Sequence, residues 1–462
     1  MSISHSLIQA VSLSLRVTNN ENTVYTSVSI DTRTLQQNAL YVPISGERFD
    51  GHQFIESAIE QGAQAAIWQK DEPVPVSLPT DFQLYFVEDT LLALQKLAKL
   101  YRKEVNPKVI GVTGSNGKTT VKDMLASILS FAGPTYKTQG NYNNHIGLPL
   151  TILGMPADCQ YLILEMGMSG YGEIHLLSTL SEPDAAVITN IGESHMEQLG
   201  SREGIAKAKA EIRDGLVAGG TLYIDGDEPL LQLLKGEDVC TVGFDQHNHN
   251  QITNVLVDST GFQFKLHSVG DFTLPMLGKH NVKNAALAAS LAKGLGVSFA
   301  HIQAGLEEVK ISGMRLERLV GDHGELIIND AYNASPTSMK ASIDALKELD
   351  GFTHYIAVLG DMYELGANEK ALHEQIADSV EAPITHLVTV GDKAEWLYEA
   401  TKKQQRSDTI KLNHAPTVQE AATLIKPSLN EQTVILLKAS RGLKLETILN
   451  YLTESGKGEM NK

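Results

Sequence analysis

The sequence predicts an α/β protein of two or three domains built on mostly parallel sheets. Its 462 residues exceed the roughly 250 to 300 at which one hydrophobic core stops growing. From residue 108 onward, short apolar runs alternate with helical patterns, and this alternation is typical of parallel strands joined by crossover helices. Hydrophobic residues make up 42% of the chain and charged residues 20%, which is the ordinary balance of a globular protein.

Three domains are predicted along the chain. Residues 1–86 form a small α/β domain with short strands such as "ALYVPI" (39–44) and "AQAAIW" (63–68), closed by the proline-rich stretch 69–81. Residues 87–312 form a central domain, with strands at 108–114, 161–167, 185–192 and 220–227. A fresh series at 325–330, 355–361, 386–392 and 433–440 predicts a Rossmann-like C-terminal domain over residues 313–462.

Charge and cysteine content limit the partners and the compartment. The net charge of −17, from 55 acidic and 38 basic residues, repels polyanions, so no nucleic-acid partner is expected and an anionic ligand must be captured locally. Cys159 and Cys240 are too few for a disulfide framework and lack metal-ligand spacing. Without a secretory signal or an apolar run of 18 residues, the chain is expected in the cytoplasm, with no membrane span.

The stretch "GVTGSNGKTT" (111–120) predicts a phosphate-binding loop between a strand and a helix. The apolar positions that follow have helical spacing: Val121, Met124, Leu125, Ile128 and Leu129. Gly114 and Gly117 would permit close approach of the backbone to a triphosphate, Lys118 would reach its β and γ phosphates, and the Thr119 hydroxyl would ligate Mg²⁺. Val112 occupies the first glycine position of the usual G-x-x-x-x-G-K pattern, so this loop is a variant form.

Polar residues follow two of the central strands and one helical segment. Glu165 ends the strand "YLIL", where a carboxylate can bind a metal ion at the carboxyl edge of a parallel sheet, and His195 follows the next strand. Taken alone, Glu165 is equally compatible with a solvated strand end, and the phosphate-binding loop upstream favours function. Taken alone, His195 favours a structural role, and Lys207 and Lys209 favour a solvated helix face. Only the combination of motifs points to function for these three residues.

The order of these motifs resembles the Mur ligase superfamily of ATP-dependent amide synthetases. It runs GSNGKTT, LEMG, NIGESH, KAEI, GKHNVKNA and GMRLE, over nearly the whole chain. The N-terminal segment 29–54 is similar to a uridine-nucleotide-binding module, except that Asn38 stands where glycine is commoner. The stretches "NDAYNASPTSM" (329–339) and "LGDMYELG" (359–366) resemble the member that adds D-alanyl-D-alanine to UDP-N-acetylmuramoyl-tripeptide. This resemblance implies an enzyme of peptidoglycan synthesis, and thus of cell-wall biogenesis, cell shape and cell division. A monomer is expected, although the sequence itself does not specify the oligomeric state.

The resemblance also implies roles for individual residues. The triphosphate would contact Gly114, Ser115, Asn116, Gly117, Lys118, Thr119 and Thr120, and the rest of the nucleotide would contact Asn281, Arg315 and Asp330. Thr119, Glu165, His195 and Lys209 would hold magnesium, with Lys209 carbamylated so that it offers oxygen ligands. Lys118, His195 and Lys209 would be the catalytic residues. The tripeptide substrate would contact Asp31, Thr32, Arg33, Gly46, Arg48, Asp50, Gly51, His52, Asn143 and Asn144, and the dipeptide Tyr332 and Asn333.

Chemically, the resemblance implies that ATP activates the peptide carboxylate as an acyl phosphate, which the dipeptide amine then attacks. A sister ligase that adds another amino acid is the nearest alternative, although the His-Thr-Pro-Asp and Asp-Asn-Pro-Arg strings expected of the ligase for the third residue are absent. A P-loop kinase or switch is a further alternative, but the Asn-Lys-x-Asp string of a GTPase is absent. A non-catalytic nucleotide-binding module would leave Glu165, His195 and Lys209 unexplained.

Overall fold

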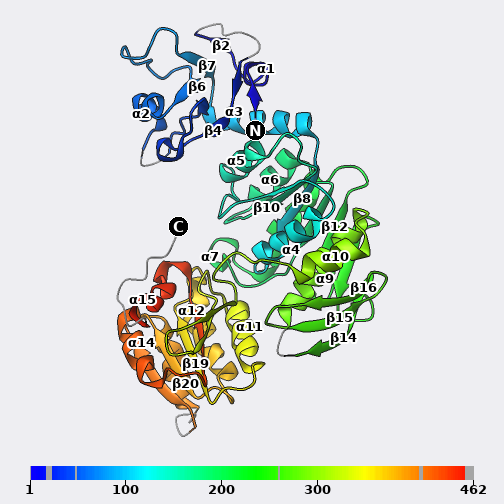
Figure 1. The fold of residues 1–462 in the computed structure, drawn as a ribbon, viewed down its shortest axis with the longest axis vertical. Coiled ribbons are helices and arrows are strands. Elements are labelled where there is room, and N and C mark those ends of the chain that lie inside the picture. The colour runs from blue at the N-terminus through cyan, green and yellow to red at the C-terminus, as the bar shows by residue number, and fades with distance from the viewer. Residues whose placement is uncertain (1, 17–22, 47–48, 259–260, 405–408, 453–462) are drawn as a thin grey trace. The chain divides into compact units, whose positions relative to one another are not determined.

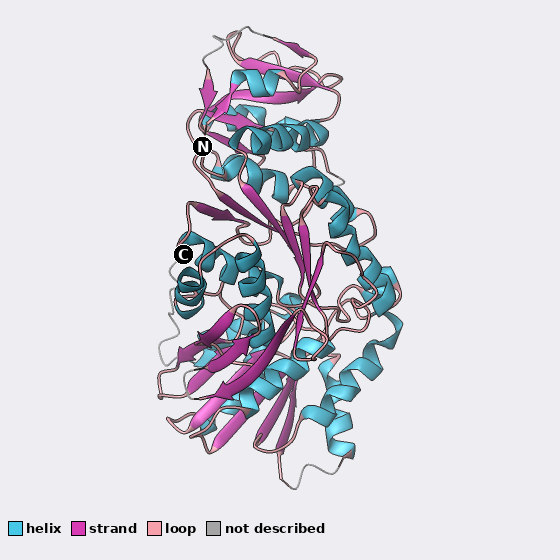
Figure 2. Cartoon of the chain, turned by 90° about the vertical axis from the view of Figure 1, so that its right-hand side faces the viewer, coloured by secondary structure: helices cyan, strands magenta, loops and turns pink. Residues whose placement is uncertain are grey.

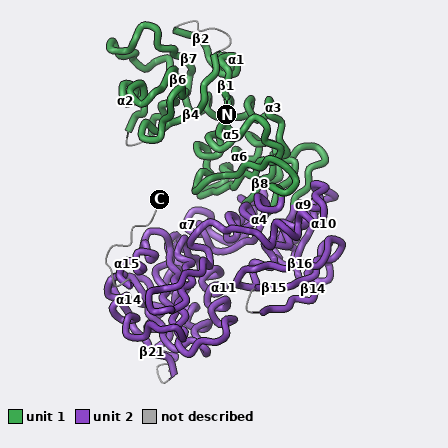
Figure 3. The backbone as a smooth tube through the Cα atoms, in the orientation of Figure 1, with its two compact units in different colours: residues 1–113, 129–187, 211–222 green, residues 114–128, 188–210, 223–462 purple. Residues whose placement is uncertain are grey.

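The computed structural model describes residues 2–16, 23–46, 49–258, 261–404 and 409–452, which form an α/β structure (Figure 1). The chain divides into two compact units (Figure 3). The first comprises residues 1–113, 129–187 and 211–222, and the second residues 114–128, 188–210 and 223–462. The predicted domain boundaries after residues 86 and 312 stay predictions. Within the described residues, no helix is both long and apolar enough to cross a bilayer.

The N-terminal part of the first unit contains a five-stranded sheet of order β2-β7-β6-β5-β4. The strands β4 (Ser27–Ser29), β5 (Ala39–Tyr41), β6 (Ala63–Gln69) and β7 (Gln83–Val87) are parallel, while β2 (Ser14–Leu15) runs antiparallel to β7. A two-stranded ribbon pairs β1 (Ile3–Ser4) with β3 (Val24–Tyr25). Two short helices, α1 (His5–Gln9) and α2 (Ile55–Glu60), complete this region. The predicted strands at 39–44 and 63–68 are confirmed as β5 and β6.

The rest of the first unit supplies parallel strands and the helices that cover them. Here the sheet order is β12-β11-β8-β10-β9, in which β11 and β12 contribute their first residues. The strands are β8 (Lys108–Thr113), β9 (Thr135–Lys137), β10 (Tyr161–Glu165), β11 (Ala185–Ile188) and β12 (Thr221–Asp225). The helices are α3 (Thr90–Val105), α5 (Gly147–Gly154) and α6 (Glu173–Ser181). All four strands predicted for the central region therefore form.

Helix α4 (Lys118–Ser130) lies in the second unit except for its last two residues, and its core-facing positions match the predicted helix face. All five of these side chains are fully buried: Val121, Met124, Leu125, Ile128 and Leu129. The short helices α7 (Met196–Leu199) and α8 (Arg202–Ala210) follow β11. In the second unit the sheet order is β16-β15-β14-β13-β12, and β14, β15 and β16 form antiparallel pairs. The remaining elements here are β13 (Val239–Gly243), β14 (Asn250–Val257), β15 (Phe262–Leu266), β16 (Gly270–Leu274), α9 (His280–Gly294) and α10 (Phe299–Glu307).

A six-stranded sheet of order β17-β18-β22-β19-β20-β21 forms the C-terminal part of the second unit. All of its pairings are parallel except that of β17 with β18. The strands are β17 (Glu317–Val320), β18 (Leu326–Asn329), β19 (His354–Gly360), β20 (His386–Val390), β21 (Lys411–Ala415) and β22 (Thr433–Lys438). Its helices are α11 (Pro336–Lys347), α12 (Glu369–Glu374), α13 (Ala394–Lys403), α14 (Val418–Ile425) and α15 (Leu449–Leu452). Figure 2 shows the chain coloured by secondary structure, with helices in cyan and strands in magenta.

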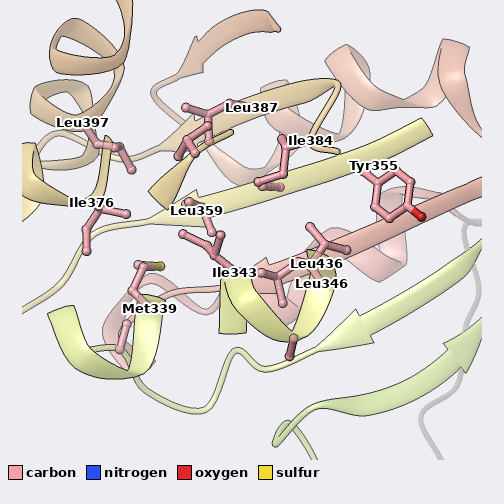
Figure 4. Packing of buried hydrophobic residues seen from close by; sticks show 14 of the residues in the cluster. Met339, Ile343, Leu346, Tyr355, Leu359, Ile376, Ile384, Leu387, Leu397 and Leu436 are labelled. Carbon is pink, nitrogen blue, oxygen red and sulfur yellow. The ribbon is translucent and has the colours of Figure 1, made fainter. Parts of the chain in front are cut away.

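Alternate residues of these strands enter two separate cores, one on each face of the sheet. Leu359 and Leu436 pack with Met339, Ile343 and Leu346 of α11 in one core (Figure 4). Neighbouring positions of the same strands, Val358 and Leu437, enter the other core together with α14. This alternation with a period of two is what a parallel sheet covered by helices on both faces requires. It leaves the carboxyl ends of the strands to carry polar loops.

Candidate active site

The loop between β8 and α4 has a backbone that only glycine accommodates at two positions. Gly114 has φ +148° and Gly117 has φ +79°, in the region that side-chain-bearing residues rarely adopt. A Cβ atom at Gly114 would lie 1.8 Å from Thr189 Oγ1, and one at Gly117 would lie 2.7 Å from Asn284 Oδ1. The loop is therefore packed tightly against the segment after β11 and against α9.

The polar atoms of this loop suit an anion. Asn190 holds the loop, because its backbone oxygen accepts from Ser115 N at 3.1 Å and its Oδ1 accepts from Asn116 N at 2.9 Å. Ser115 Oγ and Asn116 Nδ2 are buried without a hydrogen-bond partner among the described residues. Lys118 Nζ donates to the backbone oxygens of Gly114 at 2.8 Å and Ser115 at 3.2 Å. Unmatched buried groups and a lysine beside a helix N-terminus fit a polyphosphate.

Glu165 lies at the carboxyl end of β10, in register with Val112 of β8. It is only 3% exposed, and its Oε1 accepts a 3.0 Å hydrogen bond from Asn143 Nδ2. Asn144 instead uses its Oδ1 to accept from the backbone N–H groups of Ile146 and Gly147 at the start of α5. Of the two predicted substrate asparagines, Asn143 therefore contacts a predicted metal ligand and Asn144 shapes a helix start.

The segment after β11 places two polar side chains against the C-terminal region, one against a loop and one against the first turn of α11. His195 has φ +66°, and its Nδ1 lies 2.9 Å from Glu364 Oε2. Glu193 accepts from Thr337, through the hydroxyl at 2.8 and 2.9 Å and through the backbone N–H at 3.2 Å. A positive φ at a histidine is uncommon and is retained where surrounding contacts impose it.

Lys209 lies near the end of α8 in a buried environment, with 2% of its surface exposed. Burial, and after it the charge of Lys118, lowers the pKa of Lys209 well below its ordinary value. A lowered pKa increases the fraction of neutral amine, which is the form that can react with CO₂. Carbamylation of Lys209 stays a prediction.

The predicted nucleotide residues of the second unit are fixed by buried hydrogen bonds. Asn281, 3% exposed, donates from Nδ2 to Leu277 O at 2.8 Å and accepts from Asn284 Nδ2 at 3.0 Å. Asn284 also packs on Gly117, so α9 contacts the predicted phosphate-binding loop. Asp330 accepts from the buried Lys438 Nζ at 2.7 Å.

Arg315 and the two predicted dipeptide residues lie together in the loops that flank β17 and β18. The Arg315 guanidinium lies 4.2 Å from the centre of the Tyr332 ring. Its Nε is buried and has no hydrogen-bond partner in the part of the chain that the structure describes. Asn333 is exposed at the surface, and its Oδ1 accepts from the N–H of Ala334.

The predicted uridine module contains two compact polar turns in the first unit. Asp31 caps a turn and pairs with Arg33 at 2.7 Å, while the neighbouring Thr32 begins that turn. Asp50 accepts from Ser45, from the His52 N–H and from His52 Nδ1. His52 is 5% exposed, and the N–H of Gln69 donates to its Nε2 at 3.4 Å.

Two glycines and an asparagine shape these turns. A Cβ atom at Gly51 would lie 2.7 Å from Ile44 N, whereas at Gly46 the nearest neighbour, Phe49 O, is 3.8 Å away. Asn38 has φ +63°, so the asparagine adopts the left-handed conformation for which glycine is the commoner choice. The predicted substrate residue Arg48 lies outside the described residues.

Sequence reasoning missed Thr189, Asn190 and Asn284, which hold the loop between β8 and α4. Thr189 Oγ1 donates to Asn116 O, and the other two contact the loop as described above. The signal was available for Asn190, a polar residue directly after a buried strand. Among the described residues, no group of three or more His, Cys, Asp or Glu side chains is arranged to hold a metal ion.

These features define an α/β nucleotide-dependent enzyme of the P-loop type. They are a strand, a closely packed glycine turn after it, and a buried lysine in α8. Three family models match the chain in turn: the Mur ligase family, catalytic domain over residues 24–102, the Mur ligase middle domain over 112–292, and the Mur ligase, glutamate ligase domain over 314–441. Together with the relatives below, these matches show that the chain belongs to the Mur ligase family.

Two curated relatives carry the same name, UDP-N-acetylmuramoyl-tripeptide--D-alanyl-D-alanine ligase. The protein from Bacillus subtilis is 46% identical over 94% of each chain, and that from Escherichia coli is 35% identical over 93% of this chain and 94% of its own. Among solved structures, MurF from Acinetobacter baumannii superposes with a TM-score of 0.87 at 31% identity, covering 98% of this chain and 99% of its own. MurF ligase from Thermotoga maritima in complex with ADP gives 0.79 at 27% identity, covering 92% and 96%.

Proposed function

We propose that this chain is an ATP-dependent ligase that joins D-alanyl-D-alanine to UDP-N-acetylmuramoyl-tripeptide, forming an amide bond in peptidoglycan precursor synthesis. The observation that carries the proposal is the loop at Gly114–Lys118, in which a lysine and two unmatched buried polar groups suit a polyphosphate. The family membership and the shared name of the relatives support the same substrates. An ADP complex of a relative supports ATP as the nucleotide.

The activation step needs positive charge next to the peptide carboxylate. ATP, when bound, supplies the γ-phosphoryl group that converts this carboxylate into an acyl phosphate. Lys118 exchanges its contacts with the Gly114 and Ser115 oxygens for phosphate oxygens, which adds a full charge where negative charge gathers. Ser115 and Asn116 offer further donors from the same loop. Positioning and electrostatics, rather than covalent chemistry by the protein, supply most of the rate.

Magnesium is expected to bind oxygen and nitrogen ligands that come from four separate segments of the chain. Thr119 would contribute a hydroxyl, Glu165 a carboxylate, His195 a ring nitrogen and Lys209, once carbamylated, a carbamate oxygen. Glu364 at His195 Nδ1 fixes the ring orientation, in the way that outer carboxylates orient metal-binding histidines. We therefore favour a metal-binding role for His195 over proton transfer.

The amine of the dipeptide attacks the activated carboxyl carbon, phosphate leaves, and the proton of the amine passes to solvent or phosphate. Tyr332 and Asn333 are the proposed dipeptide contacts. Asn281, Arg315 and Asp330 are the proposed nucleotide contacts. Gly46 and the turns at Asp31–Arg33 and Asp50–His52 are the proposed uridine site, and Arg48, which lies outside the described residues, stays a predicted contact. His52, which is buried with both ring nitrogens in hydrogen bonds, would act there by holding Asp50.

The proposal also covers the domain organisation and the surroundings. Residues 1–86 would bind the uridine substrate, 87–312 ATP, and 313–462 the dipeptide. An acyl phosphate hydrolyses when water reaches it, which favours domains that close around the substrates. A monomer in the cytoplasm stays a prediction.

Phosphate release from ATP, measured with UDP-muramoyl-tripeptide and a panel of amines, tests the activity. We expect release that depends on both the tripeptide and D-alanyl-D-alanine. Release only with a single amino acid would favour a sister ligase. Release that depends on neither acceptor would favour a simple NTPase.

A further inference from the structure

Three neighbouring strands of the C-terminal sheet end next to one another, and their loops form one surface. In the strand order β18-β22-β19 all pairings are parallel, so their carboxyl ends lie at the same edge. Tyr332 follows β18, Arg441 follows β22 and Tyr363 follows β19. Only Tyr332 among these three was expected at a binding site from the sequence.

Side-chain hydrogen bonds hold the three loops together. Ser440 Oγ accepts from the N–H of Tyr363 at 3.0 Å and lies 3.3 Å from the Ala334 oxygen, to which it donates. A Cβ atom at Gly442 would lie 2.9 Å from the Tyr363 ring, so the loop after β22 packs directly on that ring. The three loops are therefore held together by direct contacts.

The Arg441 guanidinium is held by contacts at Nη1, while much of the side chain is exposed to solvent. Its Nη1 donates to Glu446 Oε1 at 2.8 Å and contacts Met314 Sδ at 3.3 Å. Its guanidinium carbon lies 6.0 Å from the centre of the Tyr332 ring. The side chain is nevertheless 55% exposed, whereas that of Glu446 is 15% exposed. Glu446 and Met314 thus orient the guanidinium while much of its surface stays accessible.

A second cation strengthens the field at this surface. Arg315 stacks on the same Tyr332 ring at 4.2 Å. The acidic side chain beneath the loops, Asp361, is 4% exposed and accepts from the backbone N–H groups of Lys393 and Ala394. Arg315 is a proposed nucleotide contact, so an anion on the dipeptide is assigned to the second guanidinium beside this ring, that of Arg441.

We propose that Arg441 binds the C-terminal carboxylate of the incoming D-alanyl-D-alanine and so selects a free dipeptide acid as the amine substrate. The inference rests on the function proposed above. The dipeptide must present its amine to the activated carboxyl, so its one anionic group lies at the opposite end. A guanidinium offers paired N–H donors that match a carboxylate. The rings of Tyr332 and Tyr363 provide apolar surface for the two methyl groups.

The test compares two amine substrates on matched variants. D-alanyl-D-alanine and D-alanyl-D-alaninamide differ only in the carboxylate. For the unaltered enzyme, we expect kcat/KM to favour the acid by about 10- to 100-fold, the range of a charge-assisted hydrogen bond. In Arg441→Met this preference should fall to within about threefold of unity, with the KM for ATP unchanged. Arg441→Lys, which keeps the charge but loses the paired donors, should retain an intermediate preference.

Two controls separate substrate binding from a structural role. Lys444→Met removes an exposed cation three residues further along and should keep the full preference for the acid. Glu446→Gln removes the anchoring carboxylate but leaves the guanidinium, and should keep most of it.

Equal preference in the unaltered enzyme and Arg441→Met would overturn the inference, as would an equal loss in Lys444→Met. If Arg441→Met does not fold by circular dichroism, the preference in Arg441→Lys decides: a value equal to that of the unaltered enzyme contradicts the assignment. Absence of phosphate release with every amine in the unaltered enzyme would instead refute the proposed function.

Discussion

Replacing Gly114 with alanine is the sharpest perturbation of the proposed phosphate site. At φ +148° a side chain costs about 1–3 kcal/mol in backbone strain. The new Cβ would also lie 1.8 Å from Thr189 Oγ1, so Thr189 must move and its hydrogen bond to Asn116 O is lost, at a further cost of about 1 kcal/mol. If the loop leaves its native conformation to escape this cost of about 2–4 kcal/mol, ATP must restore that conformation on binding, and its affinity then falls by up to roughly 30- to 1,000-fold.

Isothermal titration with ATP and the kcat/KM for phosphate release both measure this loss. Gly219→Ala is the matched control, since Gly219 has φ +80° and a Cβ atom added there would meet no other atom within 4 Å. This variant incurs a backbone penalty without a clash at the loop, and should bind ATP as the unaltered protein does. An unaltered ATP affinity in Gly114→Ala would refute the assignment of the loop to phosphate binding.

Three further outcomes are expected. Lys118→Ala should lower kcat by about 100- to 1,000-fold in the phosphate-release assay, because it removes a full charge from the developing transition state. Lys209→Met should lower kcat by a similar factor, and the unaltered enzyme should lose activity in CO₂-free buffer and regain it with bicarbonate; a bicarbonate-independent rate would contradict carbamylation. Although burial opposes ionisation, the hydrogen bond from Lys99 and the charge of Arg102 lower the pKa of Glu182. The ionised Glu182 therefore stabilises the fold at pH values above its ordinary pKa, and this stabilisation is lost as the pH falls through the lowered pKa. Glu182→Gln should therefore lower the melting temperature by a few degrees at pH 7, a difference that shrinks toward about pH 3; the same difference at both values would contradict the assigned pKa direction.

Hydrophobic periodicity predicted the parallel sheets because buried strands and amphipathic helices have different repeats. The five apolar positions of α4 and the strands β5, β6, β18, β19, β20 and β22 follow directly from that pattern. The antiparallel β14–β16 segment was not predicted. Its strands β15 and β16 alternate buried and more exposed residues over only five positions each, and so short a pattern does not specify which strands pair or in which direction.

The polar contacts of the candidate site were less accessible from the sequence. Gly114 and Lys118 were predicted because a phosphate-binding loop is local in sequence. Asn284 and Arg441 were not, since their roles depend on contacts between segments far apart in the chain. The family resemblance predicted a nucleotide-binding role for Arg315 and Asn281. Only the fold shows that the Arg315 guanidinium lies on the Tyr332 ring.

The ligase activity itself is tested most directly by incubating the protein with ATP, magnesium, UDP-N-acetylmuramoyl-tripeptide and D-alanyl-D-alanine, and measuring phosphate together with the UDP-linked product by mass spectrometry. We expect one phosphate for each pentapeptide product formed, with neither appearing when the tripeptide or the dipeptide is left out. Phosphate release without a pentapeptide product, or no release with the complete mixture, would contradict the proposed function.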